Sequence, residues 1–293
     1  MPPTPAPDAS FAHAAPSEDL ARIVNCFWEV RVHERSAAQS ALIVPDGSHE
    51  LVLEMGRFEE RCDAQGQLVG NEAAVMAGQL THAFELGTPS GYHAFGIRLH
   101  AWGAAALLGD DVPAITNQAA PMQAVLGARG RMLADMLMHA SDFAARVDMA
   151  QRWLRQHAHT ARLAAWLPRA AAALRGGQAR VAKVASSMNL SPRQFERVFL
   201  RQVGVSPKAF ARQQRFAQAA KVLLCAAAPP STLADVAQHC GYADQAHMAR
   251  DFRAFAGLAP SALALRLDAV SAALAGLDAR DVAFVQAPAS ARR

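Results

Sequence analysis

The C-terminal third of the chain repeats itself at a nearly constant offset. Three positions recur 52 residues later: Ala185 as Ala237, Asn189 as Gly241 and Leu190 as Tyr242. After an insertion of one residue the offset becomes 53, and the recurring pairs are Phe195 and Met248, Arg197 and Arg250, Phe199 and Phe252, Gly204 and Gly257, and Pro207 and Pro260. A fixed offset over this many positions indicates a duplicated supersecondary unit.

Each copy predicts a helix, a tight turn and a second helix. In the first copy, Val184, Ala185 and Met188 follow helical spacing. Asn189 suits the left-handed position that ends a helix, and Ser191 suits the N-cap of the next one. This is the helix-turn-helix pattern, whose second helix enters the major groove of DNA with its N-terminal residues toward the bases.

The second copy follows the same rules. Val236 and Ala237 face inward, Gly241 makes the turn, Asp244 caps the next helix and Met248 is buried in it. The alternative is a pair of helical hairpins that pack together and bind no nucleic acid, which makes the region a protein-interaction module.

A helix is predicted between the two copies, over residues 207–225. Ser206 caps it, and its 19 residues span roughly 28 Å. Two recognition helices held by such a spacer lie about one DNA turn apart, roughly 34 Å. Pro229 and Pro230 then break the chain before Ser231 or Thr232 caps the following helix.

Charge divides the chain into two unlike halves. Residues 1–175 hold 14 Lys and Arg against 18 Asp and Glu, a net charge of −4. Residues 176–268 hold 12 against 5, a net charge of +7. A basic segment of this kind favours a polyanionic partner. Most of its cations are arginines, which suit bidentate contacts with phosphate and guanine.

These residues resemble the AraC family of bacterial transcription regulators. The matching stretches are NLSPRQFERVFLRQVGVSPKAFARQQRFAQA and LADVAQHCGYADQAHMARDFRAFAGLAP, within residues 177–268. The resemblance implies two helix-turn-helix units on adjacent major-groove segments. Position 248 is usually aromatic in the family and is Met here, a soft core substitute.

The predicted DNA-contacting residues lie on the two second helices. They are Arg193, Gln194, Glu196, Arg197 and Arg201 in the first unit, and Gln245, Ala246, His247, Ala249 and Arg250 in the second. Of these, Arg193, Arg197, Gln245 and Arg250 are expected to read bases. Phosphate contacts are expected from Arg180, Lys183, Arg201, Lys208 and Arg212.

The N-terminal half differs from the helical C-terminal part, and together they predict an α+β protein of two domains. Residues 1–20 are interpreted as a flexible leader that is not a secretory signal, and residues 21–175 as one domain. Short alternating runs with Gly and Pro breaks indicate a small β-barrel or sandwich, and helices are expected from about residue 102. The runs VPDGSHELVL and HAFGIRLHAWGAAALLG resemble the cupin-like N-terminal domain of one AraC-family branch. Residues 269–293 form a C-terminal tail.

The role of this domain is open between effector binding and homodimerisation. A cupin-type barrel mouth can hold a small molecule, and the candidate residues are Trp28, His49, Glu50, Arg98 and His100. Dimerisation can use the barrel or the helices of residues 129–166. The branch that the sequence resembles implies no particular effector.

Catalysis and metal binding are not expected. The histidines follow no metal-ligand spacing, the cysteines form no C-x-x-C pair, and no cofactor is predicted. Ser48, His49 and Asp46 are neighbours in a turn without the context of a catalytic triad. The four cysteines are read as buried small side chains in a reducing compartment.

The sequence therefore predicts a cytoplasmic, non-enzymatic transcription factor that binds double-stranded DNA. Its other expected partners are a small-molecule effector, a second copy of the chain, and RNA polymerase if it activates transcription. No run of apolar residues is long enough to cross a membrane. The alternative function is a cupin-type metalloenzyme carrying a DNA-binding tether.

Overall fold

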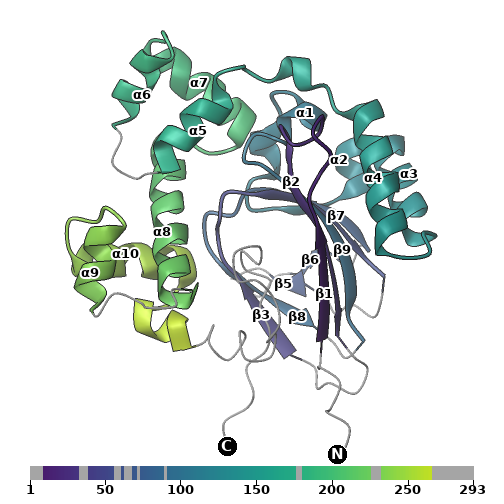
Figure 1. Ribbon diagram of the computed structural model, residues 1–293, viewed down its shortest axis with the longest axis horizontal. Helices are drawn as coiled ribbons and strands as arrows, with labels where there is room; N and C mark the ends of the chain where they lie inside the picture. The colour runs from purple at the N-terminus through teal and green to yellow at the C-terminus, as the bar shows by residue number, and fades with distance from the viewer. Residues whose placement is uncertain are drawn as a thin grey trace, which may run out of the picture.

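A computed structural model describes residues 9–32, 39–55, 61–62, 68–70, 73–88, 91–175, 180–225 and 232–265. The N-terminal part is an antiparallel sheet with helices, and the C-terminal part is helical (Figure 1). The predicted α+β class with two domains is confirmed. The expected division near residue 176 and the tail 269–293 lie outside the described residues.

Six strands form the main sheet, in the order β1-β2-β9-β4-β7-β10, and every neighbouring pair is antiparallel. Two further sheets pair β3 with β8 and β5 with β6. The strands are β1 Ala9–Ala14, β2 Val24–Val32, β3 Gln39–Ile43, β4 His49–Glu54, β5 Arg61–Cys62, β6 Leu68–Gly70, β7 Ala74–Ala77, β8 Phe84–Thr88, β9 His93–Leu99 and β10 Ala119–Pro121. Closure of these sheets into a cupin-like barrel stays a prediction.

Helices follow the strands. In the N-terminal part they are α1 Ala105–Leu108, α2 Met122–Leu126, α3 Ala128–Met138, α4 Phe143–His157 and α5 Leu167–Arg175, with 3₁₀ turns η1 Val112–Ile115 and η2 Thr160–Arg162. In the C-terminal part they are α6 Val181–Ser187, α7 Pro192–Val203, α8 Pro207–Cys225, α9 Leu233–His239 and α10 Gln245–Ala256. Within the described residues, no helix has the length and apolar character needed to span a membrane.

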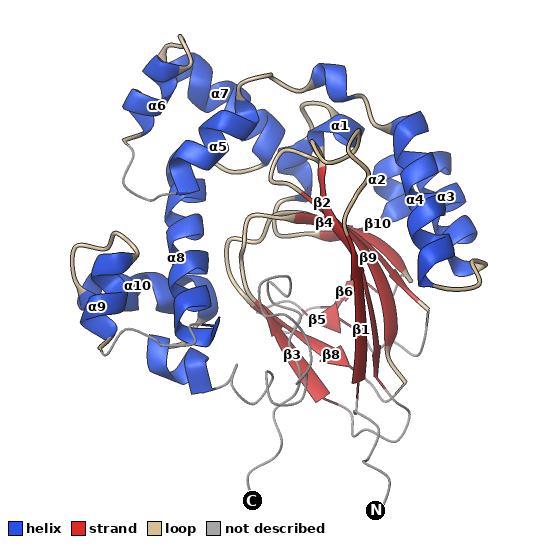
Figure 2. Cartoon of the chain, in the orientation of Figure 1, coloured by secondary structure: helices blue, strands red, loops and turns tan. Residues whose placement is uncertain are grey.

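Strand alternation gives the main sheet two different faces. Phe27, Leu51 and Phe95 point to the face that shares a core with the helices, α4 among them. Trp28 and Val52 point to the opposite face, in a separate apolar cluster. Figure 2 shows α3 and α4 on one side of the sheet and α8 on the other side of the view. In this view the sheet lies between α8 and the pair α3 and α4, and the core on the α4 face of the sheet also continues into α7 and α8.

The predicted flexible leader is wrong from Ala9 onward. Residues Ala9–Ala14 form β1, an edge strand paired along its whole length with β2. Leu20 is buried in the main core, and the Ser17 backbone N–H donates to Gln151 of α4 at 2.8 Å. The proline-rich composition concealed this strand because its pairing partner and its apolar contacts come from distant parts of the chain.

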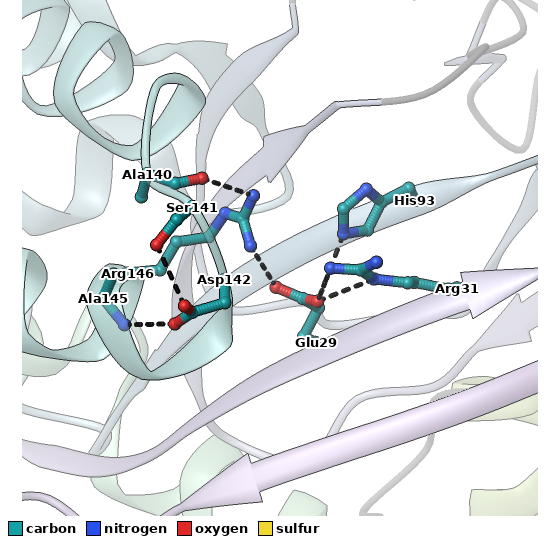
Figure 3. Close-up of polar contacts among 8 residues, drawn as sticks. All are labelled: Glu29, Arg31, His93, Ala140, Ser141, Asp142, Ala145 and Arg146. Atoms are coloured by element: carbon teal, nitrogen blue, oxygen red, sulfur yellow. Dashed lines mark hydrogen bonds and ion pairs between the residues drawn. The ribbon is translucent and has the colours of Figure 1, made fainter.

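A buried ion pair joins α4 to the sheet (Figure 3). Arg146 Nη1 of α4 donates to Glu29 Oε2 of β2 at 2.9 Å, and both side chains are almost fully buried. Arg146 also donates to the Ala140 carbonyl, and Arg31 donates to the second oxygen of Glu29. His93 lies 3.3 Å from that same oxygen, and its pKa is lowered chiefly by burial. The carboxylate thus holds a helix and two neighbouring strands together.

We expect Arg146→Met to lower the free energy of unfolding by about 3–5 kcal/mol, because it leaves the Glu29 carboxylate buried without its main partner. Denaturant unfolding of the full chain measures this effect. Arg31→Met is the matched control: the Arg31 side chain is 51% exposed, so the loss should stay within about 1 kcal/mol. Equal losses in the two variants would contradict this account.

Candidate nucleic-acid interface

The first helix-turn-helix unit is α6 and α7. Asn189 adopts a left-handed backbone (φ 57°), and the Leu190 N–H returns to the Ala185 carbonyl at 3.1 Å, which closes the turn. Ser191 caps α7 by accepting from the Gln194 N–H. Phe195, Phe199 and Val203 of α7 are fully buried. The prediction of a turn at Asn189 and a cap at Ser191 is confirmed.

The second unit repeats this geometry in α9 and α10. Thr232 caps α9 and Asp244 caps α10. Gly241 takes the left-handed position (φ 76°), and the Tyr242 N–H returns to the Ala237 carbonyl at 2.8 Å. Met248 is fully buried, where it fills the place that Phe195 fills in the first unit.

Helix α8 carries aromatic side chains into both units. Phe210 meets Phe199 of α7, with ring centroids 5.5 Å apart. Phe216 meets Phe252 of α10 at 4.9 Å and Phe255 at 5.2 Å. Figure 1 shows α8 between the two units, with α6 and α7 at one end and α9 and α10 at the other. The predicted bounds of this helix, 207–225, are those observed.

The base-facing candidates differ in how freely they are presented. Those on exposed positions are Arg193, Gln194, Glu196, Arg197, Gln245, Ala246 and Arg250. Gln194 is also part of a capping box, since its Oε1 accepts from Ser191. His247 and Ala249 are half-buried, and the His247 ring stands edge-on to Tyr242. The exposed arginines among these candidates are Arg193, Arg197 and Arg250.

Two of the phosphate candidates already contact carboxylates. Arg201 Nη1 lies 3.4 Å from Asp110 Oδ2 of the N-terminal part, with both groups more than half exposed. Arg212 Nε lies 2.6 Å from Asp251, which is buried, and the guanidinium also covers the Phe255 ring. Arg212 therefore holds α8 against α10 of the second unit. Sequence reasoning missed these pairs because each joins residues far apart in the chain.

The five effector candidates do not form one group. Trp28, Glu50 and Arg98 share a face of the main sheet, since Glu50 is paired with Arg98 and Trp28 with Gly96. His49 points to the opposite face, is fully buried, and has a pKa lowered to about 3 by burial. His100 follows the end of β9 and stacks on Trp102. Trp28, Glu50 and Arg98 therefore lie together on one face of the sheet, and His49 lies on the other face, close to the backbone of His100.

Gly96 is what allows Trp28 to lie flat on this face. A β-carbon at position 96 would come within 2.1 Å of the Trp28 ring. A glycine in a strand marks such a close approach, so the sequence carried this signal without indicating which side chain needed the space.

The Arg98 guanidinium is shared among polar groups of the turn before β4 and of β4 itself. It contacts the carboxylates of Asp46 and Glu50 and donates to Ser48 Oγ. One positive charge beside two carboxylates leaves one acid poorly compensated, and Asp46 is the closer of the two. Burial raises the pKa of Glu50 to about 8.

Metal-binding groups of three or more His, Cys, Asp or Glu side chains are absent from the described residues. Cys26 is half-buried, and Cys240 is buried with a raised pKa of about 11, caused by that burial. The surroundings of the Cys62 and Cys225 side chains lie outside the described part of the structure.

Residues 184–284 match the helix-turn-helix domain family, and residues 12–121 match a domain of unknown function, DUF6597. A comparison with curated proteins finds no match.

Three solved structures illustrate the likeness. The C-terminal domain of the response regulator AraT from Geobacillus stearothermophilus is 23% identical, with 36% of this chain and 87% of that chain covered and a TM-score of 0.32. A probable AraC family transcriptional regulator from Rhodopseudomonas palustris CGA009 is 28% identical, with 33% and 96% covered and a TM-score of 0.29. ToxT from Vibrio cholerae O395 is 10% identical, with 82% and 98% covered and a TM-score of 0.43.

We expect Glu50→Gln to change how stability depends on pH. Because the pKa of Glu50 is raised in the folded state, its favourable contribution is complete below the unfolded value of 4.5 and is lost as pH rises through about 8. The wild type should therefore lose stability relative to Glu50→Gln between pH 5 and pH 8.5. Denaturant unfolding at several pH values measures this difference. Parallel curves for the two proteins would show that Glu50 is ionised throughout.

Proposed function

We propose that this chain, which carries an AraC-type helix-turn-helix domain, is a sequence-specific DNA-binding transcription regulator that acts in the cytoplasm. The observation that carries the proposal is the pair α7 and α10. Each begins at a capped end after a tight turn and presents exposed arginines, Arg193 and Arg197 on one helix and Arg250 on the other. Arginine side chains in the first half of a recognition helix suit guanine in the major groove.

The first experiment is selection of duplexes from a random pool by the full chain. Fluorescence anisotropy then compares the selected duplex with a scrambled one across a salt series. A preference of about 10³-fold or more supports a specific regulator. Equal binding to both duplexes, or no binding at low salt, overturns the proposal.

Arg197→Ala and Arg250→Ala should each cost about 1–3 kcal/mol at the selected site and relax specificity at one base position. Arg152→Ala, an exposed arginine on α4, is the matched control and should leave the affinity unchanged. An equal loss on selected and scrambled duplex would assign Arg197 or Arg250 to the phosphates instead.

Lys183 is exposed on α6 and is proposed as a phosphate contact. Lys183→Ala should weaken binding to every duplex and lower the slope of log affinity against log salt by about 1. A slope equal to that of the wild type would remove Lys183 from the interface.

We also propose that the N-terminal part adjusts DNA binding in response to a small effector. Supporting this is the turn that precedes β4: the Asp46 carboxylate contacts Arg98, while the Asp46 carbonyl accepts from Gln214 Nε2 of α8 at 2.6 Å. A change at Arg98, Glu50 or Trp28 can therefore reach the helix between the two DNA-binding units.

If this connection transmits a signal, Gln214→Met should change the affinity for the selected duplex by about fivefold or more, the lower end of usual coupling energies. A thermal melt checks that the variant stays folded. An unchanged affinity in a folded variant would show that the contact only packs the two parts together.

No observation within the described residues favours the metalloenzyme alternative, because no group of three or more potential metal-binding side chains occurs there. Elemental analysis of the purified protein tests it, and a stoichiometric transition metal would reopen that function.

A further inference from the structure

Two neighbouring loops of the N-terminal part, residues 78–83 and 115–118, form one unit that we call the bracket. Thr81 and Asn117 hold the loops together: the Thr81 N–H donates to Asn117 Oδ1 at 2.7 Å, and Asn117 Nδ2 donates to Thr81 Oγ1 at 2.9 Å. Two backbone bonds reinforce this, from Gly78 to Gln118 and from Asn117 to Gln79, each 2.9 Å long.

The bracket bonds to three helices of the DNA-binding part. Thr116 Oγ1 donates to the carbonyl of Gly204, the residue that ends α7, at 3.0 Å. The Ala83 N–H donates to the Phe255 carbonyl in the last turn of α10 at 2.7 Å. Gln213 Nε2 of α8 donates to the Leu80 carbonyl at 3.0 Å, and the Gln213 side chain is almost fully buried.

These bonds use groups that a helix leaves open. The last carbonyls of a helix have no partner within it, and the bracket supplies one at the end of α7 and one at the end of α10. The base-facing candidates Arg193 and Gln245 lie at the opposite ends, about 15–17 Å away along these helices. The bracket therefore anchors both recognition helices and leaves their DNA-facing ends uncovered.

We propose, on the premise of the function above, that the bracket is a specificity-determining element that fixes the distance and angle between the two recognition helices. Within the C-terminal part, helix α8 joins the two units: Phe210 packs against α7, and Phe216 packs against α10, which Arg212 also contacts. The bracket adds a second connection between α7 and α10, so the two helices are linked both through α8 and through the bracket. The spacing of the two base-pair clusters that the protein accepts then depends on residues that touch no DNA.

The test uses duplexes with zero, one or two base pairs inserted or removed between the two half-sites of the selected operator. One base pair changes the half-site separation by about 3.4 Å and the angle by about 34°. The affinity of the full chain for each duplex, and for a single half-site, is measured by fluorescence anisotropy.

The variant is Thr81→Val with Asn117→Gly. Asn117 has a left-handed backbone (φ 58°), so glycine keeps that conformation while the amide is lost, and valine matches the shape of threonine. The control is Thr160→Val in η2, outside the bracket. A second variant, Thr116→Val, removes only the bond to Gly204 and serves if the double variant fails to melt cooperatively.

We expect the wild type and Thr160→Val to prefer one spacing by about tenfold over its neighbours, an energy of about 1.4 kcal/mol. The bracket variants should retain half-site affinity and reduce this preference to about threefold or less. A folded variant with the wild-type preference overturns the inference, and so does a wild type without any spacing preference. Failure of the wild type to select any duplex overturns the proposed function itself.

Discussion

The rest of the structure depends on the packing of one helix, α8, into two cores at once. Phe210 belongs to the core that continues from the sheet into α7, and Phe216 belongs to the core of the second unit. The two residues are six positions apart, about 9 Å along the helix. A rigid helix with both side chains fully buried cannot shift toward one unit without opening a cavity in the other. Such a cavity typically costs several kcal/mol.

Two arginines of α8 also contact the second unit. Arg212 pairs with the buried Asp251 and covers the Phe255 ring, while Arg215 covers the Tyr242 ring. An arginine that neutralises a buried carboxylate is costly to release, because the acid would remain buried and unpaired. Part of the positive charge counted in the basic segment therefore stabilises the fold, and the overall excess of +7 overstates what is presented to DNA.

The local features of the DNA-binding part could be predicted, and the N-terminal connections could not. Asn189, Ser191 and residues 207–225 behave as expected, because caps, left-handed turns and helical spacing are set within a few residues. The strand order β1-β2-β9-β4-β7-β10 and the strand within residues 9–14 depend on pairing between distant segments. For the same reason residue type alone could not place the effector candidates on the sheet, where strand alternation puts His49 and Glu50 on opposite faces.

The hydrogen bonds of the bracket lie at the C-terminal ends of α7 and α10, and the proposed base contacts lie nearer their N-terminal ends. This arrangement separates specificity for half-site spacing from specificity for base identity. In the proposed function, base identity depends on side chains in the first half of α7 and α10, whose contacts form only when DNA is present. Half-site spacing depends on hydrogen bonds at the helix ends, such as Thr116 to Gly204 and Ala83 to Phe255, which exist before DNA arrives. Contacts formed in advance lower the ordering cost of binding. A change in the N-terminal part that reaches Asp46 or the bracket can therefore alter which spacing is accepted while base preference stays the same.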